Sequence, residues 1–104
     1  MKKDPEVALE VAKIFKLIKE ISPGKTVELR VPPYGAIQCG EGPVHRRCTP
    51  SNQVEMNADT LIHLAINPGS WSGLIGQGQI RASGLASDLS KLFTQVSAKY
   101  QAGI

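Results

Sequence analysis

The fold is decided by the stretch Val27-Glu28-Leu29-Arg30-Val31-Pro32-Pro33-Tyr34-Gly35-Ala36-Ile37-Gln38-Cys39. In residues 27–31, valine and leucine alternate with Glu28 and Arg30, which predicts a strand with one buried face and one wet face. The proline pair ends this strand, the Tyr-Gly pair turns the chain, and residues 36–39 predict a short returning strand. The stretch therefore predicts a strand pair whose two faces differ in polarity.

An amphipathic helix is predicted before this strand pair. It begins at Asp4-Pro5-Glu6, where Asp4 is placed to accept backbone N–H bonds, proline suits the first helical position and Glu6 favours the positive end of the helix dipole. Residues 22–24, Ser-Pro-Gly, end the helix. Its apolar face is formed by Val7, Val11, Ile14, Ile18 and Ile21.

The second half of the chain alternates helices and strands. Residues 53–56 predict a third strand, and residues 60–66 a short helix capped by Asn57 or Asp59. Residues 79–83 predict the last strand. After Gly84 a second amphipathic helix is predicted, with one face formed by Leu85, Leu89, Leu92, Phe93 and Val96.

This order of elements predicts an α+β fold in which helices pack on one face of a small, mostly antiparallel sheet of four to five strands. The length of 104 residues suits a single domain over residues 1–104. The predicted fold assigns no packing partner to the polar face of the strand at residues 27–31. Glu28 and Arg30 require solvent, a partner sheet or a second subunit.

The net charge of +3 and the pI of about 9.0 make the chain only mildly basic. Lys2-Lys3 and Arg46-Arg47 are its only basic pairs, and the aromatic residues are scattered, so a nucleic-acid surface is not expected. No apolar run directly follows the N-terminal lysines, so we expect no signal peptide. The uncharged stretch 60–80 is interrupted by polar residues and glycines, so we expect no membrane insertion and a cytoplasmic protein.

Two motifs resemble those of a known family. Asn67-Pro68-Gly69-Ser70-Trp71, followed by a strand ending at Gly84 and an apolar helix, looks like the second half of sterol-carrier-protein-type lipid-binding domains. The stretch 27–39, with Glu41-Gly42-Pro43 and then His45, Arg47, Thr49 and Pro50 behind it, resembles the small sterol carrier family proteins of actinobacteria. The resemblance covers residues 22–96. Cys48 departs from the family pattern, which has a small residue there, usually glycine.

The resemblance implies a sterol-carrier-like fold and the binding of a lipid or another apolar small molecule. Apolar side chains of the second half are either an ordinary core or the lining of a pocket, and periodicity does not separate these two interpretations. The resemblance favours the pocket. Its lining would be Trp71, Leu74, Ile75, Leu89, Leu92, Phe93 and Val96.

Cys39, His45 and Cys48 are the strongest candidates for metal binding or catalysis. Two thiolates and an imidazole are zinc ligands, but this spacing matches no common zinc framework. Activation of Cys48 by His45 or by the two arginines would give a nucleophile, yet no orienting partner or oxyanion site is visible. We interpret Cys39 as a buried small hydrophobe and Cys48 as a loop thiol, and predict neither a metal nor a catalytic residue.

His45, Arg47 and Thr49 also form a candidate anion site, because the arginine fork and loop N–H groups suit an acidic head group. The alternative is that Arg47 pairs with Glu41 or Glu55 and holds the loop in place. His63 is interpreted as a surface or packed histidine, Asp59 as a helix cap and Asp88 as a first-turn residue of the last helix.

We therefore predict a binding module that needs no cofactor and is not an enzyme. A lipid or another apolar molecule is the expected partner. A dimerisation or accessory domain without a ligand is the alternative, and a homodimer would also cover the polar strand face.

Overall fold

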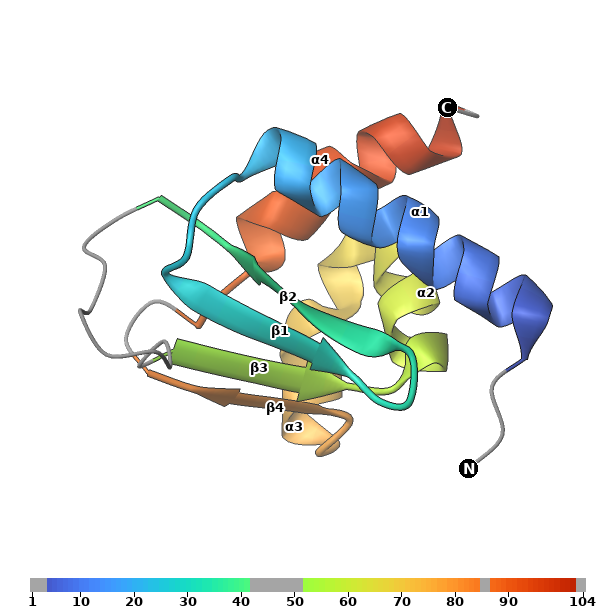
Figure 1. Cartoon of the computed structure of the whole chain (residues 1–104). Coiled ribbons are helices and arrows are strands. Elements are labelled where there is room, and N and C mark those ends of the chain that lie inside the picture. The colour runs from blue at the N-terminus through green and yellow to red at the C-terminus, as the bar shows by residue number, and fades with distance from the viewer. Residues whose placement is uncertain (1–3, 42–51, 85–86, 103–104) are drawn as a thin grey trace.

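The computed structural model describes residues 4–41, 52–84 and 87–102. Figure 1 shows an α+β arrangement with a four-stranded sheet and helices beside it. In chain order the elements are α1 (Pro5–Ile21), β1 (Val27–Val31), β2 (Gly35–Cys39), β3 (Asn52–Met56), α2 (Ala58–Ile66), the 3-10 turn η1 (Pro68–Ser70), α3 (Trp71–Gly76), β4 (Ile80–Ser83) and α4 (Ser90–Gln101). The predicted fold class is confirmed.

The described strands form one sheet in the order β2-β1-β3-β4. Both outer pairs are antiparallel, whereas the central pair, β1 with β3, is parallel, with Leu29 opposite Val54. The expected sheet is therefore confirmed in strand number and is mixed rather than strictly antiparallel. β2 pairs with one edge of β1, so the other edge of β1 is free to pair with β3.

One face of the sheet is apolar and lies under the helices. Its side chains are less than about a twentieth exposed: Val27, Leu29, Val31, Cys39, Val54, Met56 and Ile80. They join one core cluster with the buried faces of α1, α2 and α4, three helices that contact one another. In Figure 1 the strands are seen from the side that carries no helix.

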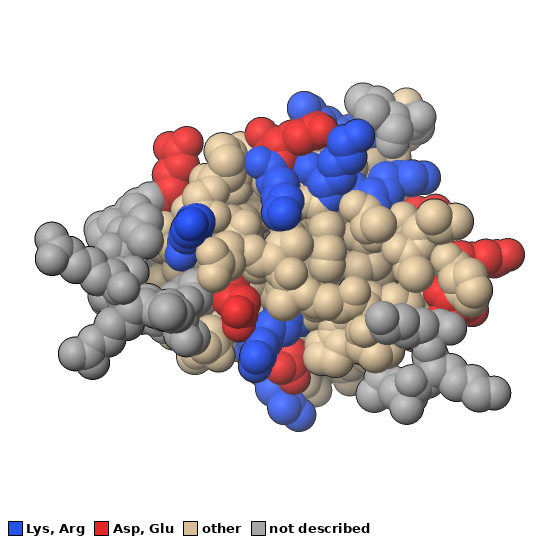
Figure 2. Space-filling view, viewed as in Figure 1, with Lys and Arg blue, Asp and Glu red and all other residues tan. Residues whose placement is uncertain are grey.

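The other face of the sheet is polar, as the alternation in β1 predicts. Figure 2 shows acidic and basic side chains alternating over β1, β3 and β4. Arg30 Nε lies 3.0 Å from Glu28 Oε1, and Arg81 Nη1 lies 3.8 Å from Glu55 Oε2. Glu28 and Arg30 therefore have each other and solvent as partners, so their charges do not require a second subunit. Pairs this exposed contribute ~1 kcal/mol or less.

Helix α1 begins where Asp4 predicts. Asp4 Oδ1 accepts from the Glu6 N–H at 2.9 Å, and the Asp4 N–H donates to Tyr34 Oη at 3.0 Å, which ties the start of the helix to the β1–β2 turn. The predicted apolar face is confirmed at Val11, Ile14 and Ile18 and extended by Leu17. Among the described residues, no helix combines the length and the apolar character that crossing a membrane requires.

Two helix starts differ from the predictions. Of the two predicted caps of α2, Asn57 is confirmed and Asp59 is wrong: Asn57 Oδ1 accepts from the Thr60 N–H at 2.8 Å, and the helix begins at Ala58 rather than at Thr60. The last helix begins at Ser90 rather than soon after Gly84, because Asp88 Oδ1 accepts from the Ser90 N–H at 2.9 Å just before the first turn. Leu85, which we assigned to this helix, lies outside the described residues.

The turn between α1 and β1 depends on Gly24. Its φ is +139°, and a Cβ placed there would lie 1.9 Å from the carbonyl oxygen of Gly40. We expect Gly24→Ala to lower the free energy of unfolding by about 2 kcal/mol or more, since both backbone strain and a backbone clash act against it. Chemical denaturation measures this loss.

The matched control is Gly76→Ala in α3, where a Cβ would meet no atom within 4 Å. Alanine favours helices over glycine, so this variant should be unchanged or more stable by up to ~1 kcal/mol. Equal stability of the Gly24 and Gly76 variants would contradict the role given to Gly24.

Candidate functional site

The candidate site is centred on one aromatic contact between α3 and α4. The rings of Trp71 and Phe93 lie stacked, with centroids 6.1 Å apart and planes inclined by 29°. Phe93 is fully buried, and Trp71 is 7% exposed. The contact joins two helices that are about twenty residues apart in sequence and places both rings in the same apolar cluster.

Six of the seven predicted pocket residues belong to this cluster or pack against it. Five are buried, namely Trp71, Leu89, Leu92, Phe93 and Val96, and Leu74 is half-buried against the core cluster. Ile75 is 37% exposed. The structure thus gathers most of the predicted set beside the apolar face of the sheet.

An open groove of about 670 Å³ lies next to this cluster, between α2 and the η1–α3 segment. Leu74 is the one predicted pocket residue that lines it. The rest of its lining consists of glycines and polar residues: Asn57, Asp59, Thr60, His63, Gly69, Ser70, Gly73, Gln77 and Gln79. His63 is exposed there, in agreement with its interpretation as a surface histidine.

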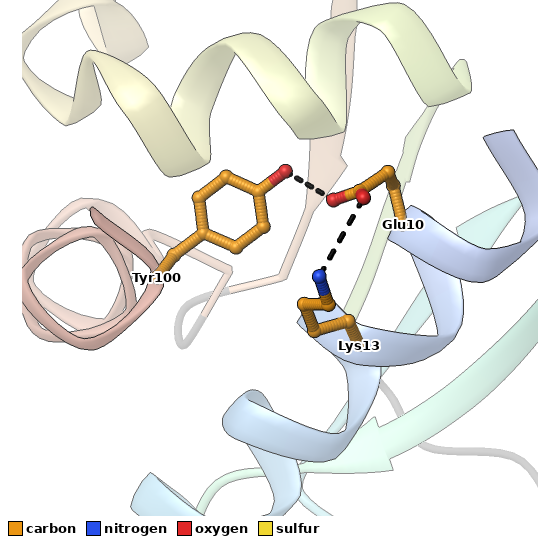
Figure 3. Close-up of polar contacts among 3 residues, drawn as sticks. All are labelled: Glu10, Lys13 and Tyr100. Carbon is orange, nitrogen blue, oxygen red and sulfur yellow. Dashed lines mark hydrogen bonds and ion pairs between the residues drawn. The ribbon is translucent and has the colours of Figure 1, made fainter. Parts of the chain in front are cut away.

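The last turn of α4 is held by polar contacts to two other helices. Tyr100 Oη donates to Glu10 Oε2 of α1, and Lys13 Nζ lies 3.6 Å from Glu10 Oε1, as Figure 3 shows. Gln101 Nε2 donates to the carbonyl oxygen of Ile66, at the end of α2, at 2.6 Å. The C-terminal end of α4 is therefore fixed to both α1 and α2.

The Glu10–Tyr100 contact shifts the titration of both groups. The hydrogen bond from Tyr100, aided by the Lys13 ammonium, holds the pKa of Glu10 below its ordinary value of 4.5. The same bond stabilises the protonated phenol and raises the pKa of Tyr100 to about 12. Because the charged form of Glu10 is favoured in the folded protein, this contact stabilises the fold above pH 4.5 and is lost as the pH falls below it.

Comparison with known proteins agrees with this architecture. A family profile described as bacterial SCP ortholog matches residues 4–94. The chain belongs to this family. The predicted resemblance to sterol-carrier-protein-like domains is thereby confirmed. No curated protein sequence matches the chain significantly.

A solved structure of the same fold is named UbiJ-SCP2 Ubiquinone synthesis protein. It is similar to this chain with a TM-score of 0.53 and 15% sequence identity, and the likeness covers 97% of each chain. At this identity the likeness shows a shared sterol-carrier-like fold and nothing about the ligand.

Cys39 is confirmed as a buried small hydrophobe at the end of β2. Burial disfavours the thiolate and raises the pKa of Cys39 to about 11, which opposes roles as nucleophile or metal ligand. Among residues 4–41, 52–84 and 87–102, no three His, Cys, Asp or Glu side chains are grouped to hold a metal. Cys48, His45, Arg47 and Thr49 lie outside the described residues, so the zinc, nucleophile and anion hypotheses for this loop stay predictions.

The sequence reasoning missed two features of this SCP-type domain. Gln77 and Gln79 line the groove, but isolated glutamines in a loop carry no signal of a site. Glu10 and Tyr100 meet across 90 positions of sequence, and neither helix pattern distinguishes them from other polar surface residues. The only sequence signal for this contact was that Glu10 and Tyr100 each lie at the border of an apolar helix face.

We expect Tyr100→Phe to lower the melting temperature near pH 6, because the variant loses the hydrogen bond that favours ionised Glu10. The difference from the unaltered protein should shrink as the pH falls below about 4.5, where Glu10 becomes protonated in both proteins. Thermal unfolding followed by circular dichroism at several pH values measures this.

Tyr34→Phe serves as the control, since the Tyr34 hydroxyl accepts from a backbone N–H rather than from a carboxylate. Its effect on the melting temperature should not vary over the same pH range. A Tyr100→Phe effect that is equally large at about pH 6 and about pH 3 would show that Glu10 ionisation is not involved.

The burial of Cys39 is tested by thiol reactivity in a Cys48→Ser variant, which leaves one thiol. With a disulfide reagent at about pH 8, the native protein should react roughly a hundredfold more slowly than the denatured protein, because a pKa raised by about two units lowers the thiolate fraction by that factor. Similar rates in the two states would contradict the assigned burial.

Proposed function

We propose that this SCP-family protein is a non-enzymatic binding module for a lipid or another apolar small molecule. The family assignment supports a carrier role. The observation that carries the proposal is the Trp71–Phe93 stack between α3 and α4, in an apolar cluster that also holds Leu89, Leu92 and Val96 and against which Leu74 packs. Ile75 lies exposed at the margin of this set.

The driving force would be burial of apolar surface. Each methylene removed from water contributes ~0.8 kcal/mol, so a long acyl chain has a large transfer free energy to offset the cost of ordering it. To admit such a chain, α4 would shift relative to α3 and open the Trp71–Phe93 contact. The polar contacts of Tyr100 and Gln101 hold the far end of α4, so we place this opening near Leu89 and Leu92.

Trp71 is the single tryptophan and lies in the proposed site, so its fluorescence reports binding directly. We expect monoolein, oleic acid or cholesterol, added below its aggregation threshold, to change the Trp71 emission in a saturable way. Native mass spectrometry of the same samples gives the number of bound molecules and the number of subunits.

Leu74→Gln should weaken binding of the same probes by about tenfold, because the apolar contact of the half-buried Leu74 is replaced by an amide that must be desolvated. Ile66→Gln is the control, since Ile66 is 56% exposed at the end of α2. If none of the three probes binds and native mass spectra show only the free protein, the proposal is wrong.

A further inference from the structure

The groove between α2 and the η1–α3 segment has a lining that differs from the apolar cluster beside it. Asp59 is its one carboxylate and His63 its one imidazole, and no lysine or arginine lines it. Among the described residues, the side chains of Asp59, His63, Gln77 and Gln79 make no hydrogen bond or ion pair with one another or with their neighbours. The groove therefore offers four exposed polar side chains whose hydrogen-bonding capacity is not used by other described residues.

The backbone of the groove is also accessible. Gly69 and Gly73 both line it, and a Cβ at Gly73 would meet no atom within 4 Å. Without side chains at these positions, a bound polar group would approach main-chain N–H and carbonyl groups closely. Hydroxyl and amine groups hydrogen-bond well with such a mixture of amides, carbonyls and a carboxylate.

The groove adjoins the proposed apolar site through α3. Leu74 lines the groove and packs against the core cluster. Trp71 lies one helical turn before Leu74 and stacks on Phe93 of α4. A molecule with a polar end in the groove would thus have its apolar end directed along Leu74 and Trp71 toward α4.

We infer that this groove holds the polar head of the bound molecule, and that the preferred head is one without negative charge. The inference rests on the proposed function and adds the class of ligand: an amphiphile with a neutral or cationic head that donates hydrogen bonds. An anionic head would face Asp59 without any cationic side chain of the groove to compensate for it.

The test compares three probes that share one oleyl-type chain and differ in the head: monoolein (neutral), oleylamine (cationic) and oleic acid (anionic). Their dissociation constants are measured at about pH 8 by Trp71 fluorescence on the intact chain. The unaltered protein should bind monoolein and oleylamine more tightly than oleic acid. In Asp59→Lys, the dissociation constant of oleic acid divided by that of oleylamine should fall by about tenfold. The new ammonium group attracts the anionic head and repels the cationic head, and both effects lower this ratio.

Glu20→Lys provides the matched control. Glu20 is exposed in the last turn of α1, and the substitution changes the net charge by the same amount. Figure 1 shows this end of α1 away from α3. This ratio should change less than twofold in that variant. Asp59→Asn, which removes the charge without reversing it, should give an intermediate ratio, and circular dichroism confirms that each variant is folded.

The outcomes separate the inference from the function on which it rests. If the oleyl chains bind but oleic acid is preferred, or if Asp59→Lys and Glu20→Lys have equal effects, the groove does not hold the head and the proposed function stands. If none of the three probes binds, the proposed function and the inference both fail. A preference for neutral and cationic heads that Asp59→Lys weakens by about tenfold, and Glu20→Lys by less than twofold, supports both.

Discussion

The structure depends on the burial of one face of a two-faced sheet. At the parallel centre, β1 and β3 place Leu29 and Val54 side by side with no exposure, while Arg30 and Glu55 face outward at the neighbouring register position. Strands of five residues do not bury such a face alone, so helices must cover it. The polar face needs no cover, because its charges pair with each other in solvent.

The same constraint bears on where the proposed binding site lies. α1, α2 and α4 contact one another over the apolar face, and the last turn of α4 is fixed by Tyr100 and Gln101. α3 is short, lies beside β4 and contributes one buried residue, Trp71. α3 packs mainly on β4 and η1, reaches α4 through the Trp71–Phe93 stack, and also lines the polar groove with Leu74.

Much of this fold follows from local sequence patterns. The alternation in residues 27–31 predicted β1 and its polar face, and Asp4 and the apolar period predicted α1. The parallel pairing of β1 with β3 was not predictable, because strand partners are chosen by burial across the whole chain rather than by either strand. The start of α4 was predicted too early, since the apolar period already includes Leu89, which lies just before the first helical residue. Only the apolar half of the proposed site was predicted, because the family resemblance favoured a pocket at apolar residues such as Trp71, Leu74 and Phe93, whereas nothing in the sequence pointed to Asp59 or Gln77.

The central claim is that an amphiphile binds with its chain between α3 and α4 and its head in the adjoining groove. Isotope-filtered nuclear Overhauser spectroscopy of labelled protein with unlabelled monoolein tests it most directly. We predict contacts from the acyl protons to the rings of Trp71 and Phe93, and from the glycerol protons to Gly73 and Gln77. Contacts confined to the polar sheet face, around Arg30 and Glu55, would contradict this account.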